Sequence, residues 1–191
     1  MDHFRQALAA EFSAYQALSN GELDALERHF NLLSIWNQKI NLTRINNMHD
    51  VVRLHYCESL FLGLKLPRVP LSIADVGSGA GFPGIPLAIL RPDCRVDLIE
   101  SDQRKAAFLR EASRELCNVK VLAVRAESVS GKYDWLVSRA VRRDGLFKLH
   151  LAPSIALVTS GDEGLPVPWG EKRRIQFVSR ETVPRETSPD E

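Results

Sequence analysis

Apolar residues recur at helical spacing through the first third of the chain. The clearest series, whose members lie three or four positions apart, is Leu23, Leu26, Phe30 and Leu33. Such spacing puts side chains on one face of a helix. Ser19, followed three residues later by Glu22, forms a capping box at the start of this series. The pattern predicts three helices, over residues 4–18, 22–40 and 50–64, with Asp50 as the cap of the last.

The pattern changes after the prolines at 67 and 70, where short apolar runs begin to alternate with helical stretches. Strands are predicted over residues 71–76, 95–100, 119–124, 133–138, 154–159 and 174–179, and helices over 85–90 and 102–116. Strands that alternate with helices imply a mainly parallel sheet. We therefore expect a Rossmann-like α/β core over residues 67–180, a helical extension packed on it over 1–66, and a disordered tail over 181–191.

A glycine-rich segment, Asp75-Val-Gly-Ser-Gly-Ala-Gly-Phe-Pro-Gly84, connects the first strand to the next helix. Residues 79–84 match the G-x-G-x-x-G fingerprint of dinucleotide sites, with Glu100 placed to hold a ribose. The frame D-x-G-x-G-x-G from Asp75 suits S-adenosylmethionine instead. That ligand has no pyrophosphate, and an acid can neutralise its ammonium and sulfonium charges. From these residues alone both interpretations remain open, with the methyl donor favoured.

Composition and charge restrict the class of protein. The net charge of +1 gives no overall preference for nucleic acid, although two basic clusters are candidates for phosphate contact. Arg139, Arg142, Arg143 and Lys148 form the first cluster, and residues 172–174 the second. No apolar run is long enough to span a membrane, and the N-terminus lacks the pattern of a signal peptide, so we expect a cytoplasmic protein without a membrane partner.

The cysteines predict neither disulfides nor a metal site. Cys57, Cys94 and Cys117 are far apart in the sequence, and no C-x-x-C pair occurs. The histidines likewise lack metal-binding spacing, so no metal is expected.

Several blocks together resemble the bacterial ribosomal RNA small-subunit methyltransferase G family, also called glucose-inhibited division protein B. The blocks are Asn41-Leu-Thr43, His55-x-x-Glu58-Ser-Leu60, residues 75–88, Glu100-Ser101, Lys105, Phe108-Leu109, Arg125-Ala-Glu127 and Ser138-Arg-Ala140. They fall between residues 31 and 140. This combination would not be expected in a dehydrogenase.

The resemblance implies a Rossmann-like class I methyltransferase that methylates guanine N7 in 16S ribosomal RNA with S-adenosylmethionine. The donor-binding residues that it implies are Asp75, Gly77, Gly79, Gly81, Phe82, Glu100, Ala126, Glu127 and Arg139. Arg139 is also the implied catalytic residue, reaching the donor or the RNA. His55 and Asn41 would order the helical extension over the site. The implied partner is 16S rRNA or the small ribosomal subunit, and the protein is expected to be a monomer.

The sequence also departs from the family pattern. Glu58 stands where the family usually has aspartate, and the lysine expected after the fifth strand is missing. Only residues 160–169 separate that strand from the approach to the last strand, which is too short for a crossover helix. A shortened C-terminal edge of the sheet is therefore predicted. A dinucleotide-dependent oxidoreductase and a non-catalytic RNA-binding relative remain as alternatives.

Overall fold

The N-terminal third is helical. The computed structural model describes residues 2–45, 47–139 and 141–179, so the predicted tail over 181–191 lies outside the described residues. The helices are α1 (Asp2–Phe12), α2 (Asn20–Asn37), α3 (Met48–Val51), a π-helical turn (Val52–Cys57) and α4 (Glu58–Lys65). The predicted capping box at Ser19 is confirmed. Two details were wrong: α1 ends well before residue 18, and Asn47 rather than Asp50 caps α3.

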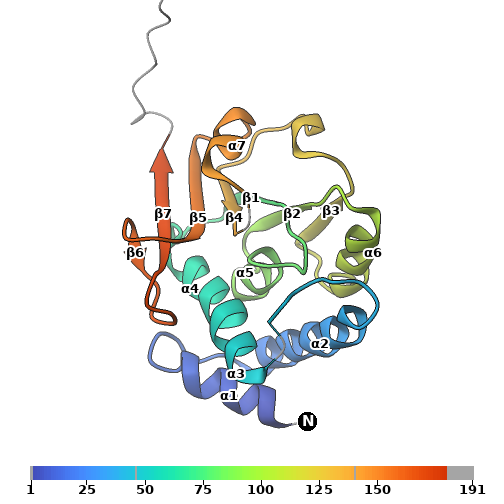
Figure 1. The fold of residues 1–191 in the computed structure, drawn as a ribbon, viewed down its shortest axis with the longest axis vertical. Coiled ribbons are helices and arrows are strands. Elements are labelled where there is room, and N and C mark those ends of the chain that lie inside the picture. Colours follow the sequence, from blue (N-terminus) through green and yellow to red (C-terminus); the bar gives the residue numbers. More distant parts are fainter. Residues whose placement is uncertain (1, 46, 140, 180–191) are drawn as a thin grey trace, which may run out of the picture.

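The rest of the chain forms a seven-stranded sheet in the order β3-β2-β1-β4-β5-β7-β6 (Figure 1). The strands are β1 (Ser72–Val76), β2 (Arg95–Ile99), β3 (Val119–Leu122), β4 (Trp135–Ser138), β5 (Ser154–Ser160), β6 (Leu165–Pro166) and β7 (Arg173–Ser179). The first five are parallel to one another, and β7 is antiparallel to β5. From β1 the sheet is built outward in one direction through β2 and β3. The chain then returns to the other side of β1 with β4, so the direction of strand addition reverses between β1 and β4.

Short helices connect the strands. They are α5 (Gly84–Leu90), α6 (Gln103–Ala112), a 3-10 turn (Ala126–Ser128) and α7 (Arg143–Lys148). The sequence pattern predicted the first two but missed α7, which has only one buried apolar residue, Leu146. Within the part of the chain that the structure describes, no helix is both long and apolar enough for a membrane crossing.

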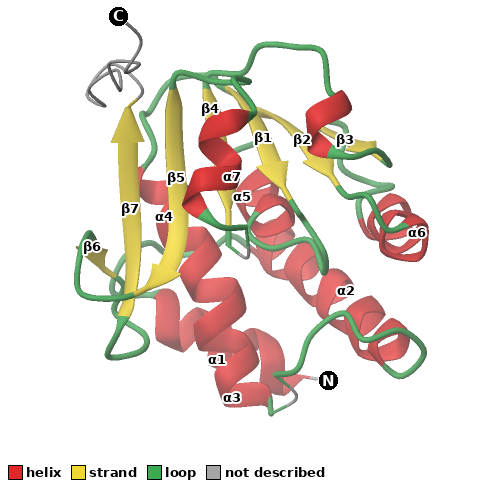
Figure 2. Ribbon diagram, turned by 45° about the horizontal axis from the view of Figure 1, so that its top comes forward, coloured by secondary structure: helices red, strands yellow, loops and turns green. Residues whose placement is uncertain are grey.

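Alternate residues of the strands pack into two separate apolar cores, one on each face of the sheet. Ile73 and Val137 belong to the core shared with α1, α2 and α4–α6, whereas Ala74 and Leu136 belong to the core shared with α7. Figure 2 shows α7 alone on the near face of β4 and β5, with α4 and α5 behind the sheet. The N-terminal helices therefore share a continuous apolar core with the sheet. They cover the face of the sheet that carries the larger of the two cores.

The C-terminal edge of the sheet is short, as predicted. Only four residues, 161–164, connect β5 to β6, and none of them is helical. β6 pairs with just Arg174 and Ile175 of β7. β6 and β7 thus form a hairpin, and β6 is the outermost strand at this edge of the sheet.

The packing of α2 supports a first prediction about stability. Leu23, Leu26 and Leu33 are buried, whereas the ring of Phe30 is only partly buried and stacks on Phe4 with centroids 4.5 Å apart. Phe30→Ala should lower the free energy of unfolding by about 2–3 kcal/mol, less than the 3–5 kcal/mol of a fully buried phenylalanine. Chemical denaturation measures the change. Ile35→Ala, on the exposed side of the same helix, is the control and should cost at most about 0.5 kcal/mol.

Candidate active site

A cavity of about 230 Å³ lies where four parallel strands end at the point of reversal. Its wall is formed by the last residues of β1 and β2, by residues that follow β1 to β4, and by residues of α7 and its C-terminal end. They are Val76, Gly77, Ile99, Glu100, Ser101, Val124, Arg125, Ala126, Glu127, Val141, Gly145 and Leu149. We call this space the switch-point cavity. Open parallel sheets bind their ligands at this position.

Gly77 lines the switch-point cavity in a backbone conformation that residues with a side chain rarely adopt. Its φ is +72°, and a Cβ built there would lie 2.9 Å from Cγ2 of Val141. The amides of Gly77 and Ser78 both donate to the carbonyl of Ile99, at 2.9 and 3.2 Å. The loop is therefore fixed to β2 with its backbone exposed to a ligand at close range.

Glu100 stands at the end of β2 with its carboxylate fixed by the backbone. One oxygen accepts the Gly79 amide at 3.0 Å and the other accepts the Asp102 amide at 2.8 Å. A carboxylate offers about four acceptor positions, so two remain for ligand hydroxyls. The geometry agrees with the predicted contact between Glu100 and a ribose.

Asp75 lies beneath the glycine loop and outside the lining of the cavity. Its side chain is completely buried, and Oδ2 accepts the amide of Gly84 at 3.0 Å, at the start of α5. Its Oδ1 is buried without a hydrogen-bond partner among the described residues. Burial raises the pKa of this carboxyl to about 7, although the Gly84 amide opposes the shift. Direct contact between Asp75 and a methyl donor stays a prediction.

The position of Asp75 also distinguishes between the two interpretations of the glycine segment. In a dinucleotide site the start of this helix holds the pyrophosphate. Here the protein's own carboxylate accepts the Gly84 amide at that position. A pyrophosphate would have to compete with this carboxylate for the same amide, so the arrangement disfavours a dinucleotide.

Phe82, predicted in the donor site, is buried under aromatic rings instead. His55 stacks on it with centroids 4.6 Å apart, while His29 and Tyr56 meet it edge-on. Burial lowers the pKa of His29 to about 4, and burial together with the charge of Arg139 lowers that of His55 to about 3. Both rings are therefore neutral near pH 7. Phe82 forms part of the wall behind the site, beyond the residues that line the cavity.

Arg139 follows β4 and lines a second cavity, of about 400 Å³. Its other lining residues are Val141, Arg142, Arg143, Asp144, Leu157, Val158, Thr159 and Gln176. We call this the arginine cavity; Val141 also lines the switch-point cavity, so the two adjoin. Nη1 of Arg139 donates to the Leu54 carbonyl at 3.1 Å, and the guanidinium lies over Phe82.

The structure thus divides the predicted site residues into three groups. Gly77, Glu100, Ala126 and Glu127 line the switch-point cavity. The second group lies in or beneath the glycine loop, outside the lining of that cavity: Asp75, Gly79, Gly81 and Phe82. Arg139 forms the third group and lines the neighbouring arginine cavity. Sequence reasoning missed Val141, which borders both cavities, because no motif marks an isolated valine. It also missed His29, whose only signal was its position three residues after Leu26, on the buried face of α2.

One member of the second basic cluster is paired within the protein. Arg173 pairs with the completely buried Glu58, with Nε 3.0 Å from Oε2. Asn41, which was predicted to help order the helical extension, is exposed. The side chain of Asn37 instead forms hydrogen bonds with the backbone of Thr43 and so holds this loop in place.

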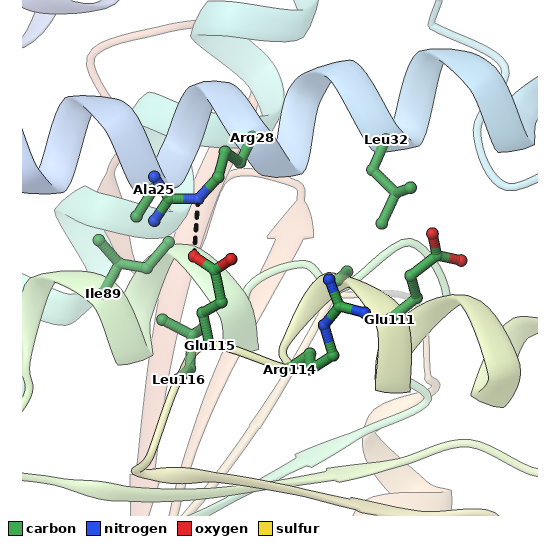
Figure 3. Close-up of a pocket in the computed structure, with 9 residues that line it drawn as sticks. Ala25, Arg28, Leu32, Ile89, Glu111, Arg114, Glu115 and Leu116 are labelled. Carbon is green, nitrogen blue, oxygen red and sulfur yellow. Dashed lines mark ion pairs between the residues drawn. The ribbon is translucent and has the colours of Figure 1, made fainter.

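A third hollow, of about 180 Å³, lies between α2 and α6 (Figure 3). Arg28 spans it to Glu115, with Nε 3.1 Å from the carboxylate. Glu111 accepts a hydrogen bond from Trp36, and the hollow lies on the helical layer, away from the carboxyl ends of the strands. We therefore do not assign it to the active site.

The strand order, the single antiparallel strand β7 and a cavity at the reversal point define a Rossmann-like class I methyltransferase fold. The profile of the family described as rRNA small subunit methyltransferase G matches residues 22–153. The chain belongs to this family, also called GidB.

Individual relatives carry the same name. Ribosomal RNA small subunit methyltransferase G of Roseiflexus sp. (strain RS-1) is 42% identical over 132 residues, covering 65% of this chain and 56% of the relative. The protein of that name from Methylobacillus flagellatus is 46% identical over 121 residues, covering 61% and 58%. This chain therefore spans little more than half the length of these relatives.

One similar solved structure is a SAM-dependent methyltransferase from Aquifex aeolicus. It is 20% identical, with a TM-score of 0.47, and the match covers 61% of this chain and 72% of that one.

Proposed function

We propose that this protein is an S-adenosylmethionine-dependent methyltransferase that methylates guanine N7 in 16S ribosomal RNA. The observation that carries the proposal is the switch-point cavity, where Gly77 leaves room for a ligand and Glu100 keeps two acceptor positions free. Family membership supports the substrate class.

The residues of the switch-point cavity fit the adenosyl part of the donor. Glu100 can accept both ribose hydroxyls, and Ile99, Val124 and Ala126 give apolar walls for a base. Glu127, which is exposed, also lines the cavity and offers a carboxylate to an exocyclic amine of the base. When bound, the donor supplies an electrophilic methyl group on a sulfonium.

Methylation of guanine N7 does not require a general base to remove a proton from the guanine. Guanine N7 carries its own lone pair and is an acceptor on the major-groove edge. The residues around the two cavities therefore have to hold the base in line and exclude water. Well-oriented reactants gain about 7–11 kcal/mol in this way. Arg139 is the proposed catalytic residue, because its planar fork of donors can orient a base through O6.

RNA would approach through the arginine cavity. Arg142 and Arg143 lie further from the strand end than Arg139, and the side chain of Arg142 is 91% exposed. Exposed arginines attract phosphate without reading the base. A base in folded RNA has to be splayed out to reach the strand ends. The proposed partner is thus 16S rRNA or the small subunit, bound by a monomer.

We further propose that residues 1–66 act as an extension of a methyltransferase core over 67–180. The extension supplies the π-helical turn that carries His55 against Phe82 and Arg139. It would therefore complete the wall of the active site.

Methyl transfer from labelled donor to purified small-subunit RNA, followed by mapping of the modified base, tests the proposal. Label at a single guanine N7 is expected. Donor binding without transfer to any small-subunit RNA would favour a non-catalytic RNA-binding relative. A thermal shift with NAD and none with the donor would favour an oxidoreductase.

Gly77→Ala provides a direct test of the donor site. The added methyl group would meet Val141 and force a side chain into a left-handed backbone conformation. We expect donor affinity to fall at least about tenfold, which corresponds to about 1.4 kcal/mol, by titration calorimetry. Gly131→Ala, where a Cβ has ordinary space and no positive φ, is the matched control. Unchanged affinity in a folded Gly77→Ala protein would remove Gly77 from the site.

A further inference from the structure

Two contacts hold one nitrogen of the Arg139 guanidinium. Nη1 donates to the Leu54 carbonyl at 3.1 Å and also meets Nδ1 of His55. The His55 ring and the guanidinium both lie against Phe82, at centroid distances of 4.6 and 5.2 Å. Among the described residues, no hydrogen bond is seen for Nη2. One side of the fork is thus fixed, and the other is available to a ligand.

These contacts determine the tautomer of His55. Two groups meet Nδ1 of His55: the Arg139 nitrogen, which can only donate, and the Leu54 carbonyl at 3.3 Å, which can only accept. The arginine contact is the closer of the two, so we assign Nδ1 as the acceptor and place the proton on Nε2. Nε2 then donates to Oγ1 of Thr43, 2.8 Å away. That oxygen also accepts the Ile45 amide at 3.2 Å, which fills its two acceptor positions. Every polar atom of the imidazole is therefore committed to this network.

Thr43 is itself held by the end of α2. The Oδ1 of Asn37 accepts the amides of Leu42 and Thr43, each at 2.9 Å, and its Nδ2 donates to the Thr43 carbonyl at 3.0 Å. The π-helical turn that carries His55 lies between α3 and α4. Such turns are rare in helices and are frequent at functional sites. A continuous series of contacts runs from α2 through the loop to Arg139.

We propose that His55 is a positioning residue for Arg139, and that Asn37 and Thr43 orient its ring so that the N-terminal helices set the direction of the guanidinium. The inference rests on the proposed function, since Arg139 is the residue that would orient the RNA base. The role of the N-terminal helices then extends beyond covering the sheet, because they determine how Arg139 faces a ligand.

Thr43→Val tests the series of contacts, because valine keeps the shape of threonine but removes the acceptor for His55. Nitrogen NMR of the Arg139 side chain should show guanidinium rotation at least about threefold faster than in the wild type. Turnover at saturating donor and RNA should fall about tenfold, as for a slightly misplaced group, while both binding affinities stay unchanged. Thr43→Ser should restore both readouts. Ser34→Ala, which removes a hydroxyl of α2 bonded only to its own helix, is the control.

A double-mutant cycle separates positioning from general loosening of the fold. In an Arg139→Lys background, Thr43→Val should reduce turnover by less than twofold, because the group that it positions is already gone. A full tenfold loss there, or unchanged guanidinium rotation in Thr43→Val, would overturn the proposal. A further outcome is a wild type that transfers no methyl group, while Thr43→Val still speeds the rotation of the Arg139 guanidinium. In that case the positioning role of His55 stands and the proposed function fails.

Discussion

Arg139→Lys should lose about 99% of methyl transfer while RNA affinity stays almost unchanged. Lysine keeps the positive charge but lacks the planar fork. It cannot contact Leu54 and His55 through one nitrogen while presenting a second nitrogen to a base. A misplacement of about 1 Å at a reacting group costs about 100-fold in rate. Single-turnover transfer to small-subunit RNA, at saturating donor and RNA, measures the loss.

Arg142→Gln is the matched comparison within the arginine cavity. Arg142 is almost fully exposed and pairs only loosely with Asp144, at 3.6 Å. Its loss should weaken RNA binding. The slope of the logarithm of the binding constant against the logarithm of salt concentration (the salt slope) should fall by about one unit, as for one lost phosphate contact. Turnover at saturating RNA should be kept. Full turnover in Arg139→Lys, or an unchanged salt slope in Arg142→Gln, would contradict this division of roles.

The sequence predicted the features that depend on local pattern. The strand runs around Ile73 and Val96 alternate with helices, and this pattern alone indicates a parallel sheet. The glycine segment from Asp75 to Gly84 located the loop, because a close backbone approach requires glycine. The shortness of 160–169 predicted the reduced C-terminal edge. Each of these inferences concerns residues that are neighbours in the chain.

Contacts between distant segments could not be predicted in the same way. His55 and Arg139 are 84 positions apart, and Glu58 and Arg173 are 115 apart. No spacing rule relates such pairs. The basic run at residues 172–174 therefore gave the same signal as an exposed phosphate-binding cluster, although Arg173 points into the protein. Asp75 is a second example. The motif located the glycine loop, but it did not reveal that the Asp75 carboxylate accepts a hydrogen bond from the Gly84 amide at the start of α5.

Arg173→Met should destabilise the fold more than Phe30→Ala does. Glu58 is completely buried in α4, and Arg173 of β7 contacts both of its carboxylate oxygens. Removing one partner of a buried ion pair leaves an uncompensated charge and costs about 3–5 kcal/mol. Chemical denaturation at pH 8 should show this loss in the free energy of unfolding. Arg142→Met, at an exposed position, should change it by at most about 0.5 kcal/mol.

The pH dependence of this loss follows from Glu58. Burial already raises the pKa of its carboxyl, and the bonds from Arg173 oppose that shift. Without Arg173 the folded-state pKa rises further above the unfolded value, so the folded protein binds a proton that the unfolded chain releases. The variant's stability should therefore fall as pH rises between those two pKa values. The deficit relative to the wild type should be largest at pH 8 and shrink toward pH 5.

A double variant, Glu58→Met with Arg173→Met, distinguishes the buried charge from lost packing. Replacing a buried ion pair by apolar side chains of similar size is often neutral or stabilising. We therefore expect the double variant to recover most of the free energy lost in Arg173→Met and to lose the pH dependence. A single variant that loses less than about 1 kcal/mol, or a double variant as unstable as the single one, would show that the ion pair does not hold β7 to α4. The C-terminal hairpin would then be held by its apolar packing, which includes Trp169 and Ile175, and by the pairing of β7 with β5.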